Sequence, residues 1–160
     1  MKSLVVYSSQ SGNTRKLAEA VYQSLPPGAS LSSVDEAPDP GDYDFVALGF
    51  WLQAGQPDPK SQAYLKKLNG HARVFLFATH GANPDSEHAR SAMTAAQAMA
   101  DGATFAGSFD CYGEVNPKVL EKVRARPDAP AWIADADKAV GHPDSADIEH
   151  LKAALGQLLA

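Results

Sequence analysis

The chain has few of the features that mark secreted or membrane-spanning proteins. Its single cysteine, Cys111, excludes a disulfide within the chain. It has no run of about 18 apolar residues, which argues against a spanning helix. The first residues lack the basic and then apolar pattern of a secretory signal and enter a strand pattern at once. We therefore expect a cytoplasmic protein.

Basic residues are too few for a nucleic-acid-binding surface. The chain has 14 Lys and Arg against 19 Asp and Glu, a formal net charge of −5 at pH 7. Nucleic-acid-binding faces are normally basic, so we expect no nucleic-acid partner, whereas a basic protein partner is compatible with this charge. The length of 160 residues and the apolar content of 44% fit one domain, residues 1–160. We expect a monomer.

The usual nucleotide and phosphoryl-transfer motifs are missing. Neither GxxxxGK[ST] nor GxGxxG occurs, so triphosphate hydrolysis and dinucleotide binding lose their usual support. Pro117 stands six residues after Cys111 where a cysteine phosphatase loop has Arg. The acidic residues of receiver domains are replaced by Ser8 and Ser9 after the first strand and by Phe50 after the third. The five histidines show no metal-ligand spacing, and we expect no metal.

The chain does contain alternating strand and helix patterns. Continuous apolar runs, typical of strands buried on both faces of a parallel sheet, occur at residues 4–7, 44–50 and 73–79. Weaker strands are expected at residues 29–34 and 104–112. Helices are expected at residues 14–25, 59–69, 86–99 and 118–123 and from residue 145 onward. This alternation predicts an α/β fold with helices on both faces of a parallel sheet.

In such a sheet the ligand crevice lies at the carboxyl ends of the strands, where the strand order reverses. We therefore expect functional loops at residues 8–14, 50–58 and 80–85. The second of these reads "WLQAGQPD" after Phe50 and is expected to be a loop. Asp58 should cap the helix that follows, with Pro59 in its first turn. Asp85 or Ser86 should cap the next helix.

The loop "SSQSGNT" at residues 8–14 joins the first strand to the first helix. A helix start leaves backbone N–H groups without partners and carries a partial positive charge, which suits a phosphate. Gly12 allows close backbone approach and positive φ. Arg15 and Lys16 are expected on the solvated surface. The alternative is a capped turn that binds nothing. Side-chain donors are available from Ser9, Ser11, Asn13 and Thr14.

These residues resemble flavodoxins. Residues 9–14 match the family's [ST]-x-[ST]-G-N-T loop, which holds the phosphate of FMN, and "YDFVALGF" is similar to the family's third strand. The resemblance implies a three-layer, doubly wound α/β fold with a five-stranded parallel sheet in the order 2-1-3-4-5 and FMN at the switch point. The phosphate contacts that it implies are Ser9, Gln10, Ser11, Gly12, Asn13 and Thr14.

The resemblance also implies contacts to the flavin ring from the loops after the third and fourth strands. Trp51 is the first choice for stacking, the alternative being a loop aromatic packed in the core. Gly55 is placed beside the reactive flavin nitrogen because glycine tolerates both peptide orientations, although Ala54 or Gln56 could supply the peptide instead. The ring contacts implied are Phe50, Trp51, Leu52, Ala54, Gly55, Thr79, His80, Gly81, Ala82 and Asn83.

Two regions depart from the flavodoxin pattern. Flavodoxins usually have a Tyr after the fourth strand, and here His80 is the only ring in that loop. Either His80 covers the flavin or that face is open. Residues 113–143 are irregular and rich in proline, and Trp132 within them either anchors the segment to the core or serves in docking. Cys111 is expected to be a small buried apolar residue.

Three functions are compatible with these patterns. The first is an FMN-binding electron-transfer protein that shuttles electrons between two redox partner proteins, a reductase and an acceptor enzyme. The departures favour the second, an FMN-dependent oxidoreductase or a dedicated flavin subunit of a partner reductase. The third is a binding module without flavin, since fold does not dictate function.

Overall fold

The computed structural model describes residues 1–159. Its main sheet is built from five parallel strands, joined in the order β2-β1-β3-β5-β6. A two-residue strand, β4 (Gln56–Pro57), pairs antiparallel with β3 and lies off this path, so the order 2-1-3-4-5 is confirmed for the five expected strands. These strands are β1 (Ser3–Tyr7), β2 (Ser30–Ser33), β3 (Phe45–Gln53), β5 (Val74–His80) and β6 (Phe105–Tyr112).

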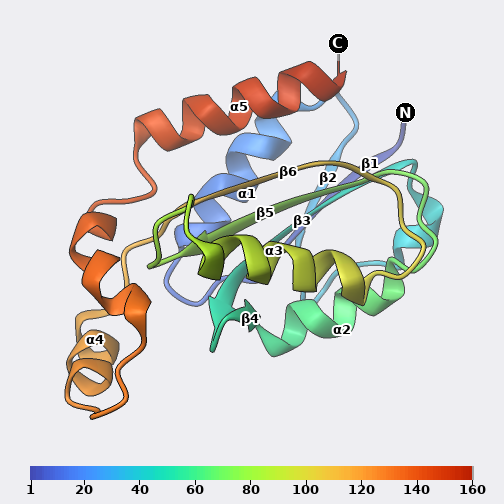
Figure 1. Ribbon diagram of the computed structural model, residues 1–160. Helices are drawn as coiled ribbons and strands as arrows, with labels where there is room; N and C mark the ends of the chain where they lie inside the picture. The colour runs from blue at the N-terminus through green and yellow to red at the C-terminus, as the bar shows by residue number, and fades with distance from the viewer. Residues whose placement is uncertain (160) are drawn as a thin grey trace.

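Helices cover both faces of the sheet, which confirms the three-layer α/β fold. Figure 1 shows α1 (Asn13–Ser24) and α5 (Ser145–Leu159) on one face, and α2 (Pro59–Lys67) and α3 (Glu87–Met99) on the other. The 3-10 helix η1 (Pro40–Asp42) precedes β3. The helix α4 (Pro117–Arg124) and the 3-10 helix η2 (Ala131–Ala139) lie beyond one end of the sandwich, at the lower left of Figure 1.

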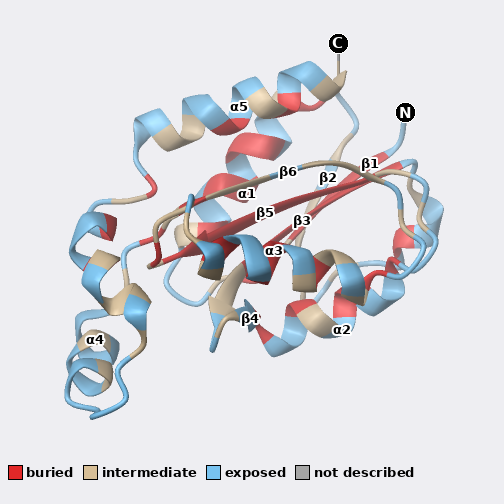
Figure 2. Ribbon diagram, viewed as in Figure 1, coloured by how far each residue is buried: buried red, intermediate tan, exposed pale blue. Residues whose placement is uncertain are grey.

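The apolar runs of the strands divide their side chains between two cores. Val5, Phe75 and Phe77 are fully buried toward α1 and α5, where Leu17 and Leu151 meet them. The neighbouring strand positions, among them Leu4, Val6 and Leu76, pack toward α2 and α3. Figure 2 shows the central strands buried along most of their length. The two-sided burial explains why these strands read as continuous rather than alternating apolar runs.

The segment "WLQAGQPD" is not the loop that the sequence predicts. β3 continues through Trp51 to Gln53 and turns back into β4. The two connecting residues, Ala54 and Gly55, have φ values of 52° and 77°, which are the signs of a type I′ hairpin turn. The sequence prediction failed because such turns usually read Asn-Gly or Asp-Gly, and Ala in the first position hides the signal.

The expected helix caps are confirmed. The Asp58 carboxylate accepts the Ser61 N–H at 3.1 Å at the start of α2, and Ser86, rather than Asp85, accepts the Ala89 N–H at 3.2 Å at the start of α3. Cys111 is buried at the end of β6, as expected, and burial raises the pKa of its thiol. Within residues 1–159, no helix is both long enough and apolar enough to span a bilayer.

Candidate functional site

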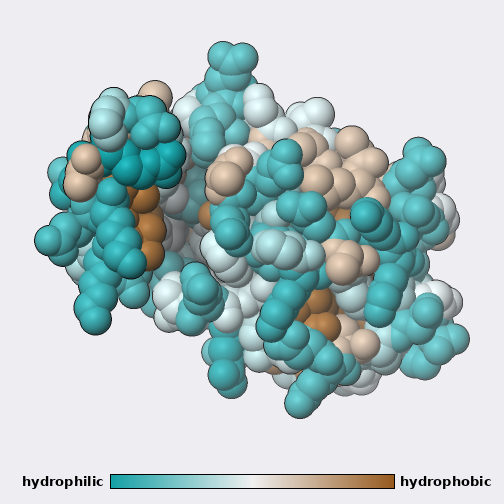
Figure 3. Space-filling model, turned by 90° about the horizontal axis from the view of Figure 1, so that it is seen from below, coloured by the Kyte–Doolittle hydropathy of each residue, from teal (hydrophilic) through white to brown (hydrophobic). Residues whose placement is uncertain are grey.

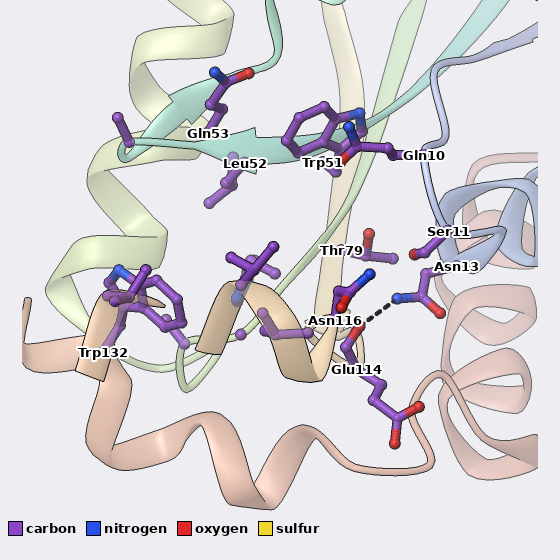
Figure 4. A pocket seen from close by; sticks show the side chains of 18 of the residues that line it. Gln10, Ser11, Asn13, Trp51, Leu52, Gln53, Thr79, Glu114, Asn116 and Trp132 are labelled. Carbon is purple, nitrogen blue, oxygen red and sulfur yellow. Dashed lines mark hydrogen bonds between the residues drawn. The ribbon is translucent and has the colours of Figure 1, made fainter. Parts of the chain in front are cut away.

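A cavity of about 630 Å³ lies at the carboxyl ends of the central strands. Its volume is within the range of small-molecule and cofactor pockets. Four segments and His88 of α3 line it. The segments are residues 10, 11, 13 and 14 around the start of α1, residues 51–55 in the β3-β4 hairpin, residues 79–82 around the end of β5, and a segment between residues 113 and 132. Figure 4 shows Ser11 and Asn13 at one end of the cavity, Trp51 and Leu52 nearer its middle, and Trp132 toward the opposite end.

The loop before α1 presents a helix start that no side chain among the described residues caps. Gly12 stands at the N-cap with φ of 95°, a conformation that glycine adopts without strain. The Ser9 hydroxyl accepts the Gly12 N–H at 3.0 Å and so closes the loop from within. The first N–H groups of α1 thus remain available beside the exposed Gln10 and Ser11, an arrangement that suits an anion.

The loop is tied to neighbouring segments by two further hydrogen bonds. The Thr14 and Thr79 hydroxyls are 3.0 Å apart, which connects α1 to the end of β5. The Asn13 Nδ2 group donates to the Glu114 carbonyl at 3.0 Å, shown as the dashed line in Figure 4. The start of α1 is therefore held in place by the end of β5 and by the segment that follows β6.

Asp58 connects the loop before α1 to the β3-β4 hairpin through hydrogen bonds. Its carboxylate is 1% exposed and accepts the Ser8 hydroxyl at 2.8 Å, the Ser61 hydroxyl at 2.8 Å and the Trp51 N–H at 3.4 Å, besides capping α2. The sequence predicts Asp58 as a cap only, because its contact with Ser8 spans 50 residues. These bonds fix the hairpin relative to the loop before α1.

Most of the predicted site residues come together around the cavity. The structure brings twelve of them to its walls. Ser9 and Gly12 lie in the first loop without lining the cavity. Asn83 turns away and accepts the Asp85 N–H at 2.9 Å. The twelve that line it are Gln10, Ser11, Asn13, Thr14, Trp51, Leu52, Ala54, Gly55, Thr79, His80, Gly81 and Ala82.

The expectation that the Phe50 ring contacts the flavin needs correction. Phe50 has no exposed surface and packs in the core under α2 and α3. Successive residues of a strand point to opposite faces, so the continuation of β3 buries Phe50 and brings the half-buried Trp51 to the cavity. The alternative of a core position for Trp51 is likewise excluded by its place in the cavity wall.

His80 does not cover the cavity. Its side chain is 2% exposed and its Nε2 atom lies 2.7 Å from the Asp110 carboxylate. The Nδ1 atom is buried and has no hydrogen-bond partner among the described residues. His88, in the first turn of α3, lines the cavity beside Gly55, and its pKa is lowered by burial and then by repulsion from His80.

The comparison with protein families settles the membership of the chain. The family model described as a flavodoxin domain matches residues 4–156. The chain belongs to the flavodoxin family.

Two curated relatives of this flavodoxin-family chain carry the name flavodoxin-like domain-containing protein BilS. The one from Clostridioides difficile (strain CD3) is 29% identical, and the match covers 92% of this chain and 90% of the relative. The one from Clostridium symbiosum (strain WAL-14163) is 28% identical with the same coverage of both chains. Both matches thus extend over most of this chain and of the relative.

Solved structures support the same fold. A flavodoxin from Streptococcus pneumonia TIGR4 superposes with a TM-score of 0.65 at 12% identity, over 99% of this chain and 98% of that one. A flavoprotein in complex with FMN from Lactobacillus acidophilus NCFM has a TM-score of 0.57 at 18% identity, over 68% of this chain and 92% of that one. At these identities the likeness shows the fold alone.

The residues that the sequence analysis missed come mainly from the segment after β6. Apart from the short helix expected at residues 118–123, this sequence is irregular and proline-rich and carries no signal that would place side chains at the cavity. Trp132 is the one side chain of the segment for which the sequence suggests a role, in anchoring or in docking. His88 and Gln53 were missed as well. The segment contributes Gly113, Glu114, Val115, Asn116, Val119, Val123, Arg126, Pro130 and Trp132 to the cavity wall.

Proposed function

We propose that this chain binds FMN in the cavity and transfers electrons between a reductase and an acceptor enzyme. The observation that carries the proposal is the continuity of the cavity: one end is an open helix start surrounded by neutral donors, and the middle is bounded by Trp51 and Leu52. A phosphate joined to a flat apolar ring needs both kinds of surface in one site.

The phosphate end fits a dianion held without ionic partners. Among the described residues that line it, Gln10, Ser11, Asn13 and Thr14 are all neutral. The N-terminus of α1 carries a partial positive charge equivalent to about half an elementary charge, and its free N–H groups supply directed hydrogen bonds. Such a site binds a phosphate through the backbone and short side chains.

The ring end fits an aromatic ligand. Trp51 and Leu52 come from the rigid β3-β4 hairpin, and Gly81 and the small, buried Ala82 follow β5. Bound FMN would supply the redox chemistry, and the protein would bind it, orient it and limit its contact with water. The exposed tip of the hairpin, at Gln53 and Ala54, lies beside the ring end and offers a path for electrons to a docked partner.

The surface charge supports exchange with protein partners. The formal net charge of −5 would speed encounters with a basic reductase or acceptor. Rates of electron transfer to such a partner should then fall as ionic strength rises, because exposed charges are screened over about 8 Å at 0.15 M salt.

The test is a titration of the purified, flavin-free chain with FMN and with riboflavin, followed by absorption spectra during stepwise reduction. We expect tight binding of FMN, weaker binding of riboflavin and a shift of the flavin spectrum on binding. A chain that leaves the fluorescence and the spectrum of FMN unchanged would be a binding module without flavin, and the proposal would fail.

A second function, an FMN-dependent oxidoreductase or a dedicated flavin subunit of a partner reductase, is favoured by the wall at residues 113–132. This segment contributes nine of the residues that line the cavity. Turnover of NAD(P)H with a quinone by the purified chain alone would support the enzyme. Reduction only after a reductase is added would support the electron carrier.

A further inference from the structure

We propose that Trp132 is a flavin-binding residue and that it forms, with Val115 and Val119, a second wall of the ring site opposite Trp51 and Leu52. The inference rests on the proposed binding of FMN. Figure 4 shows Trp51 and Leu52 on one side of the cavity, and Trp132 on the other side, next to α4. All five side chains line the same cavity although they come from segments more than 60 residues apart.

The end of β5 cannot supply this second wall by itself. The His80 ring is buried and bonded to Asp110, so it is not available to face a ligand. Gly81 has no side chain, and Ala82 is small and buried. A flat ring held under Trp51 would therefore have no large side chain from this loop on its other side.

Trp132 and Val115 occupy the space above Gly81. A Cβ atom added at Gly81 would lie 2.6 Å from Val115 Cγ2, closer than real Cβ contacts, and 3.1 Å from Trp132 Cζ3, a tight contact. The second wall thus packs directly on the backbone after β5, and a larger residue at position 81 would have to displace Val115. The structure thus brings the Trp132 ring to a loop whose only ring in the sequence, His80, is buried.

Trp132 belongs to a segment, residues 115–141, whose two ends lie next to each other at the end of β5. The Glu114 N–H donates to the His142 carbonyl at 2.9 Å, and the Gly113 N–H donates to the His80 carbonyl at 2.8 Å. These bonds join the two ends of residues 115–141 and fix them to β5. We refer to residues 115–141 as the excursion.

Apolar side chains of the excursion face the cavity and are not buried in the core. None of the residues of α4 is buried, and Val119 is 46% exposed, yet Val119 and Val123 line the cavity. Figure 3 shows the hollow between the excursion and the body of the molecule, with apolar atoms of the excursion along its edge. A flat apolar ligand would remove this surface from water, which stabilises binding.

The two tryptophans of the chain allow a direct test, because both line the cavity. The variant Trp51→Phe leaves Trp132 as the only tryptophan, and Trp132→Phe leaves Trp51. Each is titrated with FMN while tryptophan fluorescence is recorded. We expect FMN to quench both single tryptophans strongly, with the same dissociation constant that the flavin signal gives. Quenching of Trp51 together with unquenched Trp132 would overturn the inference.

Binding measurements test the same wall without fluorescence. Trp132→Ala should weaken FMN and riboflavin by the same factor, roughly 2- to 13-fold, as expected for one aromatic contact. Gly81→Ala should weaken both ligands as well, because it displaces Val115 and Trp132, and it serves if Trp132→Ala does not fold. Val140→Ala is the matched control, since Val140 is exposed in the same excursion and does not line the cavity.

The outcomes separate this inference from the proposed function. Failure of the unaltered chain to bind FMN overturns both. Normal binding of FMN by the unaltered chain, with unchanged affinities in Trp132→Ala and Gly81→Ala, overturns the second wall alone and leaves the proposed function intact.

Discussion

The hydroxyl groups of Thr14 and Thr79 lie 3.0 Å apart, and both side chains are almost fully buried. Thr14 belongs to the first turn of α1 and Thr79 to the end of β5, so this contact fixes the helix start to an interior strand of the sheet. The residue that completes the proposed phosphate loop therefore also contributes to the stability of the domain. Nearby Ser11 is exposed and free of such a role.

Replacing Thr14 and Ser11 separates these two roles. Ser11→Ala should weaken FMN by about 10-fold or more, as for a hydrogen bond to a charged group, and leave riboflavin affinity and stability unchanged. Thr14→Ala should also weaken FMN more than riboflavin and should lower the free energy of unfolding by about 1–3 kcal/mol, because the buried Thr79 hydroxyl loses its partner. Titrations and chemical denaturation measure both effects. Equal loss of both ligands in Ser11→Ala would contradict the loop assignment.

Asp58 should be among the most sensitive polar residues of the fold. Asp58→Ala removes the cap of α2 and leaves the buried Ser61 and Ser8 donors without an acceptor, so we expect a loss of about 2–5 kcal/mol in chemical denaturation. Asp39→Ala is the matched control, because Asp39 caps the short helix η1 by accepting only the exposed Gly41 N–H. A loss in Asp58→Ala no larger than that in Asp39→Ala would contradict this role.

The hairpin between β3 and β4 can be improved at Ala54. Its φ of 52° is unfavourable for alanine and well tolerated by asparagine, and Asn-Gly is the preferred type I′ pair. Ala54→Asn should therefore raise the free energy of unfolding by about 0.5–1 kcal/mol. Ala54→Val, which puts a β-branched residue at positive φ, should lower it instead. The same sign of change for both variants in thermal or chemical denaturation would exclude this turn.

His88 makes stability depend on pH. Its pKa in the folded state lies below the usual 6.5, first because of burial and then because of His80. Between pH 6.5 and the lowered pKa, His88 therefore binds more protons in the unfolded chain than in the folded chain. The free energy of unfolding falls as the pH falls through this range. Well above pH 6.5, His88 is neutral in both states and its contribution is constant. His88→Gln should flatten the dependence between pH 7 and 5, measured by denaturation across that range. An unchanged slope would assign the acid sensitivity to other groups.

Most of the helices and strands, but not the β3-β4 hairpin, followed from local patterns in the sequence. Apolar runs such as residues 73–79 predict buried strands, and Asp58 and Ser86 mark helix starts through their own side chains. The proposed phosphate loop could be recognised for the same reason, since residues 9–14 are contiguous and lie between a strand and a helix. The order of the strands came from the family resemblance that this loop provided.

The walls of the ring site depend on contacts between distant residues. Phe50 is buried in the core and Trp51 faces the cavity because β3 continues to Gln53 and successive side chains of a strand face opposite ways. Trp132 packs beside Gly81, about 50 residues earlier in the chain, a contact that no periodicity encodes.

The sequence by itself determined the alternation of elements, the helix caps and the loop at the start of α1, because propensity, capping and apolar periodicity act over a few neighbouring residues. Only the tertiary structure decided which rings face the cavity. That choice depends on how the hairpin and the excursion pack against the end of β5, and packing is settled by shape and volume between segments that are far apart in the chain.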